Sequence, residues 1–168
     1  LTNNDNAPTL HLRKVVTTDN GGQATLADFT LTANGTGSND ISGTSPVDSD
    51  STLKADTFAL SETNVSGYTP SSWSCLGGTQ NGSNITLGLG QEATCTITNN
   101  DNAPSLTLVK SVSNTHGGNA VATDWTLTAT GSTTISGAGG ASSGSNFSAG
   151  TYTLSESTGP LGYDAGNW

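Results

Sequence analysis

The chain has 168 residues, a formal net charge of −9, and charged side chains at only 10% of its positions. Its four basic residues form no cluster, and nucleic-acid binding requires lysine and arginine against phosphate, so we expect no nucleic-acid partner. No apolar run reaches the length of a membrane span. Serine and threonine supply 51 residues and glycine 22, which disfavours helices and favours strands joined by turns.

The sequence repeats itself with a period of about 96 residues. Residues 1–35 align without gaps on residues 97–131, and twenty of these thirty-five positions are identical. Self-similarity at a fixed period marks a tandem array of one folding unit. We expect the final strand of a preceding repeat at 1–6, a complete repeat at 7–102, and a second, C-terminally incomplete repeat at 103–168.

Alternation of apolar and polar residues predicts short strands along the complete repeat. In chain order, the residues expected to share one face are Leu10, Leu12, Lys14 and Val16, then Phe29, Leu31 and Ala33, then Phe58, Leu60 and Glu62, then Ile85, Leu87 and Leu89, and finally Cys95, Ile97 and Asn99. A turn at 19–22 suits a hairpin between the first two strands, and the apolar-poor stretch 36–56 is expected to be a long exposed loop. The fold class is therefore all-β, as tandem antiparallel β-sandwich domains of the prealbumin or Ig-like kind.

The two cysteines, Cys75 and Cys95, each adjoin an alternating stretch of the same repeat. This placement predicts a disulfide between neighbouring strands, and the alternative is a pair of buried thiols. A bond closing a loop of about twenty residues would stabilise the fold by roughly 3 kcal/mol. It would also indicate an oxidising, extracytoplasmic compartment.

Three polar residues fall on the apolar faces of the predicted strands. Lys14 shares a face with leucines, Glu62 follows Phe58 and Leu60, and Asn99 follows Cys95 and Ile97; the second repeat places Lys110 and Glu156 in the same pattern. Side chains two apart in a strand point the same way, so these groups are expected to face the core. Lysine and glutamate are rarely buried unless they are paired.

Such a trio has a chemistry available to it. Burial disfavours the charged forms of lysine and glutamate, and a neutral lysine amine is a nucleophile. Attack of Lys14 on the side-chain carbonyl of Asn99, with Glu62 moving protons, would expel ammonia and leave an isopeptide bond between the first and last strands. The alternatives are an ordinary Lys14–Glu62 salt bridge at a strand end, or no contact at all.

The sequence also resembles a known family at these positions. In the second repeat, Tyr152-Thr-Leu-Ser-Glu156 followed by Pro160-Leu-Gly-Tyr163 is similar to the G-x-Y-x-L-x-E…P-x-G-Y signature of Cna B-type, or SpaA-like prealbumin-fold, domains. The first repeat has the looser form Phe58-Ala-Leu-Ser-Glu62 with Gly67-Tyr68. Leu12-Arg-Lys14 resembles the first strand of such domains and Thr96-Ile-Thr-Asn99 the last.

This resemblance implies tandem shaft domains of bacterial surface proteins and pili. In many such domains a lysine, an asparagine and a catalytic glutamate form an isopeptide bond. The resemblance thus implies that Lys14 and Asn99 are the bonding pair and Glu62 the catalyst, with Lys110 and Glu156 as their counterparts in the second repeat.

The string Asn-Asp-Asn-Ala-Pro occurs where each repeat begins. It is similar to the calcium-binding linker of cadherins, and calcium does require several oxygen ligands. Asn100 and Asp101 are therefore candidate calcium ligands, and the alternative is a hydrogen-bonded turn. No other cofactor is expected.

Two functions are compatible with these patterns. The first is a structural repeat of an extracellular bacterial surface fibre or adhesin stalk, whose partners are neighbouring repeats or subunits. The second is an adhesin module that binds a glycan or a host protein through the variable loops at 36–56 or 131–146. Enzymatic turnover is not expected, because beyond the single-turnover cross-link no catalytic constellation is present.

The ends of the chain suggest a further hypothesis. Trp168 corresponds to Trp73, so either the chain continues or the second unit accepts a strand from a neighbouring chain by β-strand addition. Leu1-Thr-Asn3 corresponds to Ile97-Thr-Asn99 and could offer Asn3 to Lys110.

Overall fold

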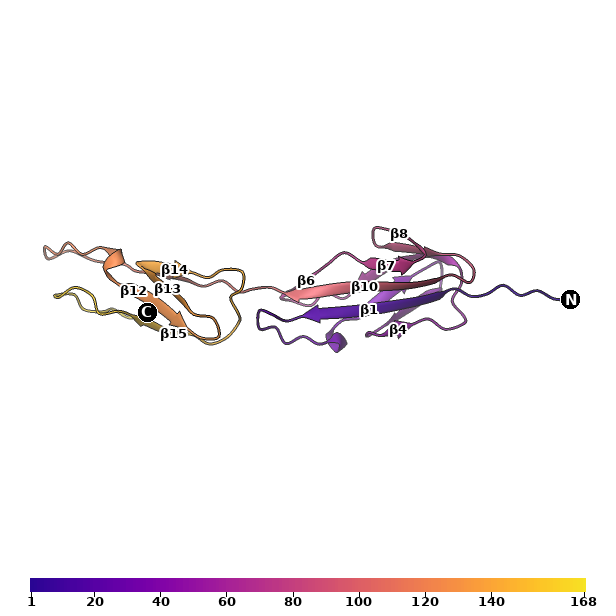
Figure 1. Ribbon diagram of the computed structural model, residues 1–168, viewed down its shortest axis with the longest axis horizontal. Helices are drawn as coiled ribbons and strands as arrows, with labels where there is room; N and C mark the ends of the chain where they lie inside the picture. Colours follow the sequence, from indigo (N-terminus) through magenta and orange to yellow (C-terminus); the bar gives the residue numbers. More distant parts are fainter. The chain divides into compact units, whose positions relative to one another are not determined.

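The computed structural model describes all residues from 1 to 168 and separates into two units (Figure 1). The first unit comprises Leu1–Thr18 and Gly22–Asn102, and the second comprises Asp19–Gly21 and Ala103–Trp168. Strands dominate both units, which confirms the predicted all-β fold.

The first unit contains two sheets. One sheet has the order β4-β1-β10-β6, with β7 also paired to β10; its strands are β4 (Val47–Asp48), β1 (Thr9–Thr17), β10 (Glu92–Asp101), β6 (Tyr68–Pro70) and β7 (Ser74–Gly77). The other sheet has the order β3-β2-β5-β9-β8; its strands are β3 (Asp40–Gly43), β2 (Leu31–Asn34), β5 (Asp56–Glu62), β9 (Asn84–Leu87) and β8 (Thr79–Asn81).

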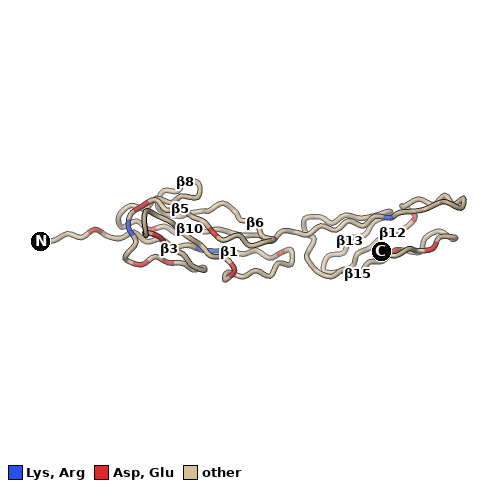
Figure 2. The backbone as a smooth tube through the Cα atoms, turned by 180° about the vertical axis from the view of Figure 1, so that it is seen from behind, with Lys and Arg blue, Asp and Glu red and all other residues tan.

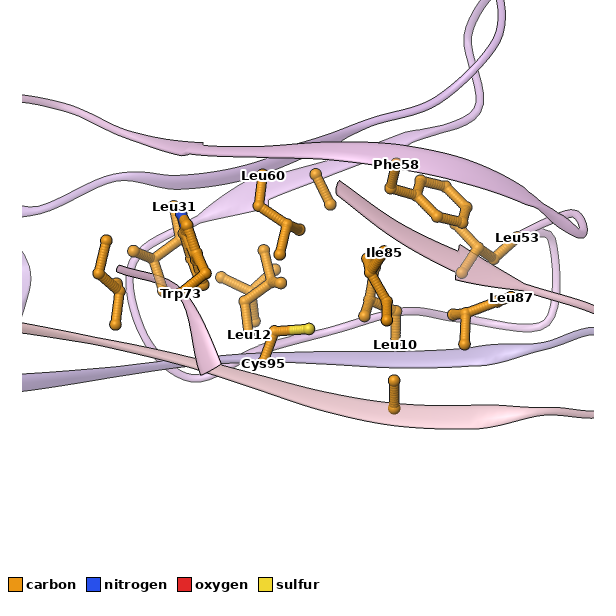
Figure 3. Close-up of a cluster of buried hydrophobic side chains, with 14 residues drawn as sticks. Leu10, Leu12, Leu31, Leu53, Phe58, Leu60, Trp73, Ile85, Leu87 and Cys95 are labelled. Atoms are coloured by element: carbon orange, nitrogen blue, oxygen red, sulfur yellow. The ribbon is translucent and has the colours of Figure 1, made fainter. Parts of the chain in front are cut away.

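The core of this unit lies between the two sheets (Figure 3). The predicted faces point inward on both sides: Leu10 and Leu12 of β1 are fully buried, as are Phe58 of β5 and Ile85 of β9. Burying one such side chain stabilises the fold by about 1.5–3 kcal/mol. The alternation therefore predicted these core residues correctly on both sheets.

One strand pair departs from the antiparallel expectation. β1 and β10 are parallel, in a register that runs from Thr9 opposite Glu92 to Thr17 opposite Asn100. Parallel neighbours require a long crossover, and here nearly the whole repeat separates the two strands. The first and last strands of the repeat thereby become direct neighbours.

The predicted hairpin between the first two strands is wrong. β1 pairs with β10 and β4, whereas β2 pairs with β3 and β5 in the opposite sheet. The chain crosses between the sheets through a short 3-10 helix, η1 (Leu26–Asp28), where the Asp28 carboxylate accepts hydrogen bonds from the backbone and side chain of Thr25. A Gly-rich turn signals a change of direction but does not say which sheet the chain joins next.

Two smaller predictions also need correction. The stretch 36–56 is not an exposed loop, because it forms β3 and β4 and buries Val47 and Leu53 in the core. β3 has no buried residue and β4 has only two residues, so neither shows a clear alternation of apolar and polar residues. Leu89 was expected on the buried face, yet it is 60% exposed, since β9 ends at Leu87 and the chain turns at Gly90, whose φ is +66°.

The second unit repeats part of this plan. One sheet pairs β11 (Thr107–Val109) with β14 (Gly140–Ser142). The other has the order β13-β12-β15, with β13 (Ile135–Ala138), β12 (Thr126–Thr130) and β15 (Thr153–Glu156). A second 3-10 helix, η2 (Ala122–Asp124), stands before β12 as η1 stands before β2. The variable stretch 131–146 thus also contributes strands.

Candidate functional site

The candidate site of the first unit is assembled from both sheets. Lys14 lies on the inner face of β1, and Asn99 lies on the inner face of β10, where its register partner on β1 is Val16. Glu62 ends β5 in the opposite sheet. Strand parity directs all three side chains into the space between the sheets.

These three side chains meet at the lysine amine. Lys14 Nζ donates a hydrogen bond of 2.7 Å to Glu62 Oε2 and another of 2.6 Å to Asn99 Oδ1. The Lys14 side chain is 0% exposed and that of Glu62 only 8%. Amine, carboxyl group and carboxamide are therefore in direct contact in a site with almost no access to water.

Burial acts on the titration of the amine. Removal of Lys14 from water lowers its pKa below 10.5, while the hydrogen bond and the charge of Glu62 oppose that shift. Desolvation is the largest of these effects, since it disfavours the charged form of a buried lysine. The environment thus favours the neutral, nucleophilic amine more than water does.

The second unit contains the matching ion pair. Lys110 Nζ lies 2.7 Å from Glu156 Oε2, with side chains 15% and 21% exposed. Two open cavities of about 510 and 350 Å³ adjoin Lys110. Asn3 lies in the exposed segment before β1 and in no strand, so its suggested bond to Lys110 stays a prediction.

The disulfide prediction is confirmed. Cys75 of β7 and Cys95 of β10 are directly opposed in register and are joined by an S–S bond, with 20 residues of sequence separation. β10 is therefore covalently linked to β7 and carries Asn99 beside β1. By the chain-entropy model such a loop stabilises the fold by roughly 3 kcal/mol.

The candidate calcium ligands do not converge. Asn100 is exposed, whereas Asp101 is buried and its Oδ2 accepts a 2.6 Å hydrogen bond from the backbone amide of Gly22. No group of three or more His, Cys, Asp or Glu side chains that could hold a metal ion occurs in the structure. A calcium site at Asn100 and Asp101 stays a prediction.

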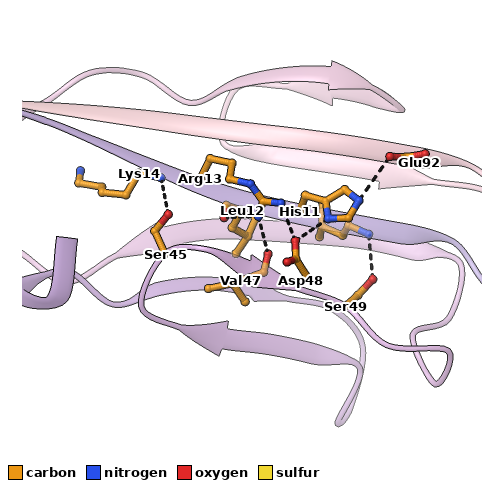
Figure 4. A network of polar contacts seen from close by, with 10 residues as sticks. His11, Leu12, Arg13, Lys14, Ser45, Val47, Asp48, Ser49 and Glu92 are labelled. Carbon is orange, nitrogen blue, oxygen red and sulfur yellow. Dashed lines mark hydrogen bonds and ion pairs between the residues drawn. The ribbon is translucent and has the colours of Figure 1, made fainter.

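The strands also bring together residues that sequence patterns did not single out. On the outer face of β1, Asp48 of β4 lies 2.6 Å from His11 Nδ1 and accepts a 2.7 Å hydrogen bond from Arg13 (Figure 4). The hydrogen bond from His11, followed by that from Arg13, holds the pKa of Asp48 below its usual value. Lys and Arg occur at few, separated places along the backbone, which agrees with the absence of a basic cluster (Figure 2).

Aromatic rings cover the lysines, a feature that the sequence patterns did not single out. The Phe29 ring centroid lies 4.3 Å from Lys14 Nζ, and that of Trp125 lies 4.7 Å from Lys110 Nζ. Phe29 and Trp125 are equivalent across the repeat, so a comparison of the two lysine environments could have revealed them.

The fold and the site together define a tandem β-sandwich protein whose units carry a lysine–glutamate pair between their sheets. A family model of the SpaA-type prealbumin-like fold domain matches residues 5–97 and 101–168, and the chain belongs to this family. This confirms the resemblance noted in the sequence. Domains of this type are structural modules typical of surface-exposed pilus proteins. A search of curated proteins finds no match, and no helix is long and apolar enough to cross a membrane.

Proposed function

We propose that this chain is a load-bearing segment of an extracellular surface fibre, and that Lys14 and Asn99 form an isopeptide bond within it. The observation that carries the proposal is the contact of one buried amine with both Glu62 and Asn99, at 2.7 and 2.6 Å. The disulfide supports an oxidising, extracytoplasmic location.

The reaction uses only groups present in the site. A proton passes from the Lys14 ammonium to the Glu62 carboxylate, which leaves a neutral amine and a neutral acid. The amine attacks the side-chain carbonyl carbon of Asn99, and a new C–N bond forms. The acid returns its proton to the amide nitrogen as the old C–N bond breaks, the attacking nitrogen loses its second proton to Glu62, and ammonia leaves.

The arrangement of the strands gives this bond a mechanical role. The chain enters the sheet at Thr9 of β1 and leaves it at Asp101 of β10. Because these neighbours are parallel, tension applied at those two points loads the strand pair in shear along its whole register. A bond from Lys14 to Asn99 would pass the load directly from the first strand to the last.

The amount of chain protected in this way is large. Lys14 and Asn99 are 85 residues apart in sequence. At about 3.3–3.6 Å per extended residue, the cross-link would withhold roughly 300 Å of chain from extension. Such a unit would keep its length under tension and resist proteolysis.

Intact mass of the purified, folded chain tests the cross-link. We expect a loss of about 17 Da, one ammonia, beyond the loss of two hydrogens at the disulfide, and a peptide that joins Lys14 to Asn99 after digestion. Asn99→Ala and Glu62→Gln should both restore the ammonia mass. Asn100→Ala is the matched control, because Asn100 is the exposed neighbour and should leave the loss intact. An unchanged mass in the folded wild-type chain would show that Lys14 and Glu62 form only an ion pair.

Single-molecule pulling then tests the mechanical role. With force applied at the two ends, the first unit of the wild type should not release the chain between Lys14 and Asn99. Asn99→Ala should release roughly 300 Å less the length held by the disulfide. Equal extension of the two proteins would contradict the load-bearing role.

A further inference from the structure

A glycine, a tyrosine and the aromatic ring over the lysine form the same arrangement in both units, and we call it the aromatic latch. A tyrosine packs edge-on against the ring that covers each lysine: Tyr68 against Phe29 with centroids 5.9 Å apart, and Tyr163 against Trp125 at 5.4 Å. Each tyrosine hydroxyl also accepts a backbone hydrogen bond from the segment that precedes the 3-10 helix. The donors are Ala24 at 2.9 Å in the first unit and Ala120 at 3.1 Å in the second.

A glycine makes room for each tyrosine hydroxyl. A Cβ added to Gly22 would lie 2.2 Å from the hydroxyl oxygen of Tyr68, and one added to Gly118 would lie 2.1 Å from that of Tyr163. Neither glycine has a positive φ, so space is the requirement here and not backbone conformation. The same glycine, tyrosine and covering ring therefore occur twice, around two separate lysines.

In the first unit the latch also contacts β10, the strand that carries Asn99. Gly22 donates to the carboxylate of Asp101, which lies on the same inner face of β10 as Asn99 and is the register partner of Tyr68. The segment 22–29 is thus fixed at one end by Tyr68 and Asp101 and carries Phe29 at the other.

We propose that Tyr68 and Gly22 are positioning residues for the Lys14–Asn99 reaction, because they hold the Phe29 ring against the amine and exclude water from it. Neither residue touches the reacting atoms. They act through Phe29, whose ring occupies the space in which water would solvate the ammonium. This inference rests on the proposed cross-link and adds to it the residues that set its rate.

The proposal has a measurable pH signature. The titratable side chains of the neighbouring elements on this side of the site are Glu62 on β5, Asp101 on β10 and Tyr68 on β6. Glu62 is hydrogen-bonded to the Lys14 amine and favours the charged form of that amine, whereas burial of Lys14 disfavours the charged form. If the latch opens, water reaches Lys14 and its pKa rises towards 10.5. Each unit of that rise lowers the neutral fraction about tenfold at a given pH below the pKa.

The test measures the rate of ammonia loss after folding. The full chain is recovered from inclusion bodies in denaturant, folding is started by dilution at about pH 5 to about pH 9, and mass is followed with time. Tyr68→Phe, which removes only the hydroxyl, Gly22→Ala and Phe29→Leu should react about tenfold more slowly at about pH 7 and regain rate as the pH rises. Phe29→Trp, which introduces the ring of the second unit, should retain most of the rate.

Two controls match these changes. Gly144→Ala adds a Cβ where no atom lies within 4 Å, and Tyr152→Phe removes a hydroxyl in the second unit that bonds to Ser148. Both should react at the wild-type rate. A wild-type rate in Tyr68→Phe at about pH 7, or a slowing by the same factor at every pH, would overturn the positioning role.

A second measurement separates failure of the latch from failure of the cross-link. In an Asn99→Ala background, where no bond can form, NMR titration of the Lys14 side chain should give a higher pKa when Tyr68→Phe is added. If the wild-type chain never loses ammonia, the cross-link is wrong, and this titration still decides the latch. An unchanged Lys14 pKa would overturn it.

Discussion

The two lysine sites of the chain share a geometry and differ in their surroundings. Lys14 and Lys110 each lie 2.7 Å from a glutamate oxygen and each lie under an aromatic ring. The Lys14 side chain is 0% exposed, whereas that of Lys110 is 15% exposed and borders open cavities. In the first unit β10 lies directly beside β1, and within residues 103–168 β11 has only β14 as a partner.

This difference separates two contributions to the site. The lysine–glutamate pair and the aromatic ring over the lysine are present in both units. In the first unit the strand that carries Asn99 supplies the carboxamide and lies directly beside β1. In the first unit the Lys14 side chain is 0% exposed, and burial favours the neutral form of its amine.

The largest expected effect comes from removal of Glu62, and removal of Glu156 is the comparison. Glu62→Ala leaves a buried amine without its charged partner and should destabilise the first unit by about 3–5 kcal/mol, besides preventing the cross-link. Glu156→Ala should destabilise the second unit by less than this, because the Lys110 and Glu156 side chains are more exposed, at 15% and 21%. Hydrogen exchange followed by mass spectrometry can report each unit separately. Equal losses would show that the extra burial of Lys14 has no energetic consequence.

The disulfide should have the next largest effect, and only on the first unit. Replacing both Cys75 and Cys95 by alanine opens a loop with 20 residues of separation and should cost roughly 3 kcal/mol. The same exchange measurement should show faster opening of β7 and β10 and unchanged protection of β12. Loss of protection in β12 would mean that the two units unfold together.

Acid should also distinguish the units. Asp56 accepts hydrogen bonds from the backbone amides of Thr36 and Thr57 and from the side chain of Asn39. These hydrogen bonds lower the pKa of Asp56 from 3.8 to about 2. A depressed folded pKa means stability that is present above 3.8 and lost as the pH falls from there through about 2. The second unit has Gly150 at the corresponding place, two residues before Tyr152.

Asp56→Asn should therefore flatten the acid sensitivity of the first unit within that window. The hydrogen-exchange protection of β5 in the wild type should fall between about pH 4 and about pH 2, and it should fall less in the variant. Some loss of protection with falling pH should remain in the variant, since hydrogen bonds also lower the pKa of Asp28 and Asp50. An identical decline in both proteins would contradict the role of Asp56.

The sequence was sufficient for most inward faces of the strands and for the three polar side chains that meet at the Lys14 amine. Period-two parity alone placed Lys14, Glu62 and Asn99 towards the core, because side-chain direction is a local property of a strand. The pairing of one strand with another is not determined by local sequence. The parallel pairing of β1 with β10 and the separation of β1 from β2 depend on which faces pack together across the whole repeat.

The same limit explains the residues that were missed. Phe29 belonged to a predicted strand face, but its contact with Lys14 arises only once η1 has carried the chain to the opposite sheet. The sequence does not predict β3 and β4, because β3 has no buried residue and the two-residue β4 has only one, Val47, so neither produces a periodic signal. Comparison of the two repeats recovers part of this information, since a feature present in both is constrained by the shared fold.

The smallest expected effect concerns the outer face of β1, where the repeats also differ. Arg13 contacts Asp48 in the first unit, and the equivalent residue of the second unit is Val109, which is 75% exposed. Arg13→Val introduces the second repeat's residue and should change stability by less than about 1 kcal/mol, because exposed ion pairs are screened by water. The effect should shrink further in high salt, and the rate of cross-linking should not change, since Arg13 points away from Lys14 across the strand. A loss of several kcal/mol in urea unfolding would mean that the outer network, and not only the buried trio, holds β1 in its place beside β10.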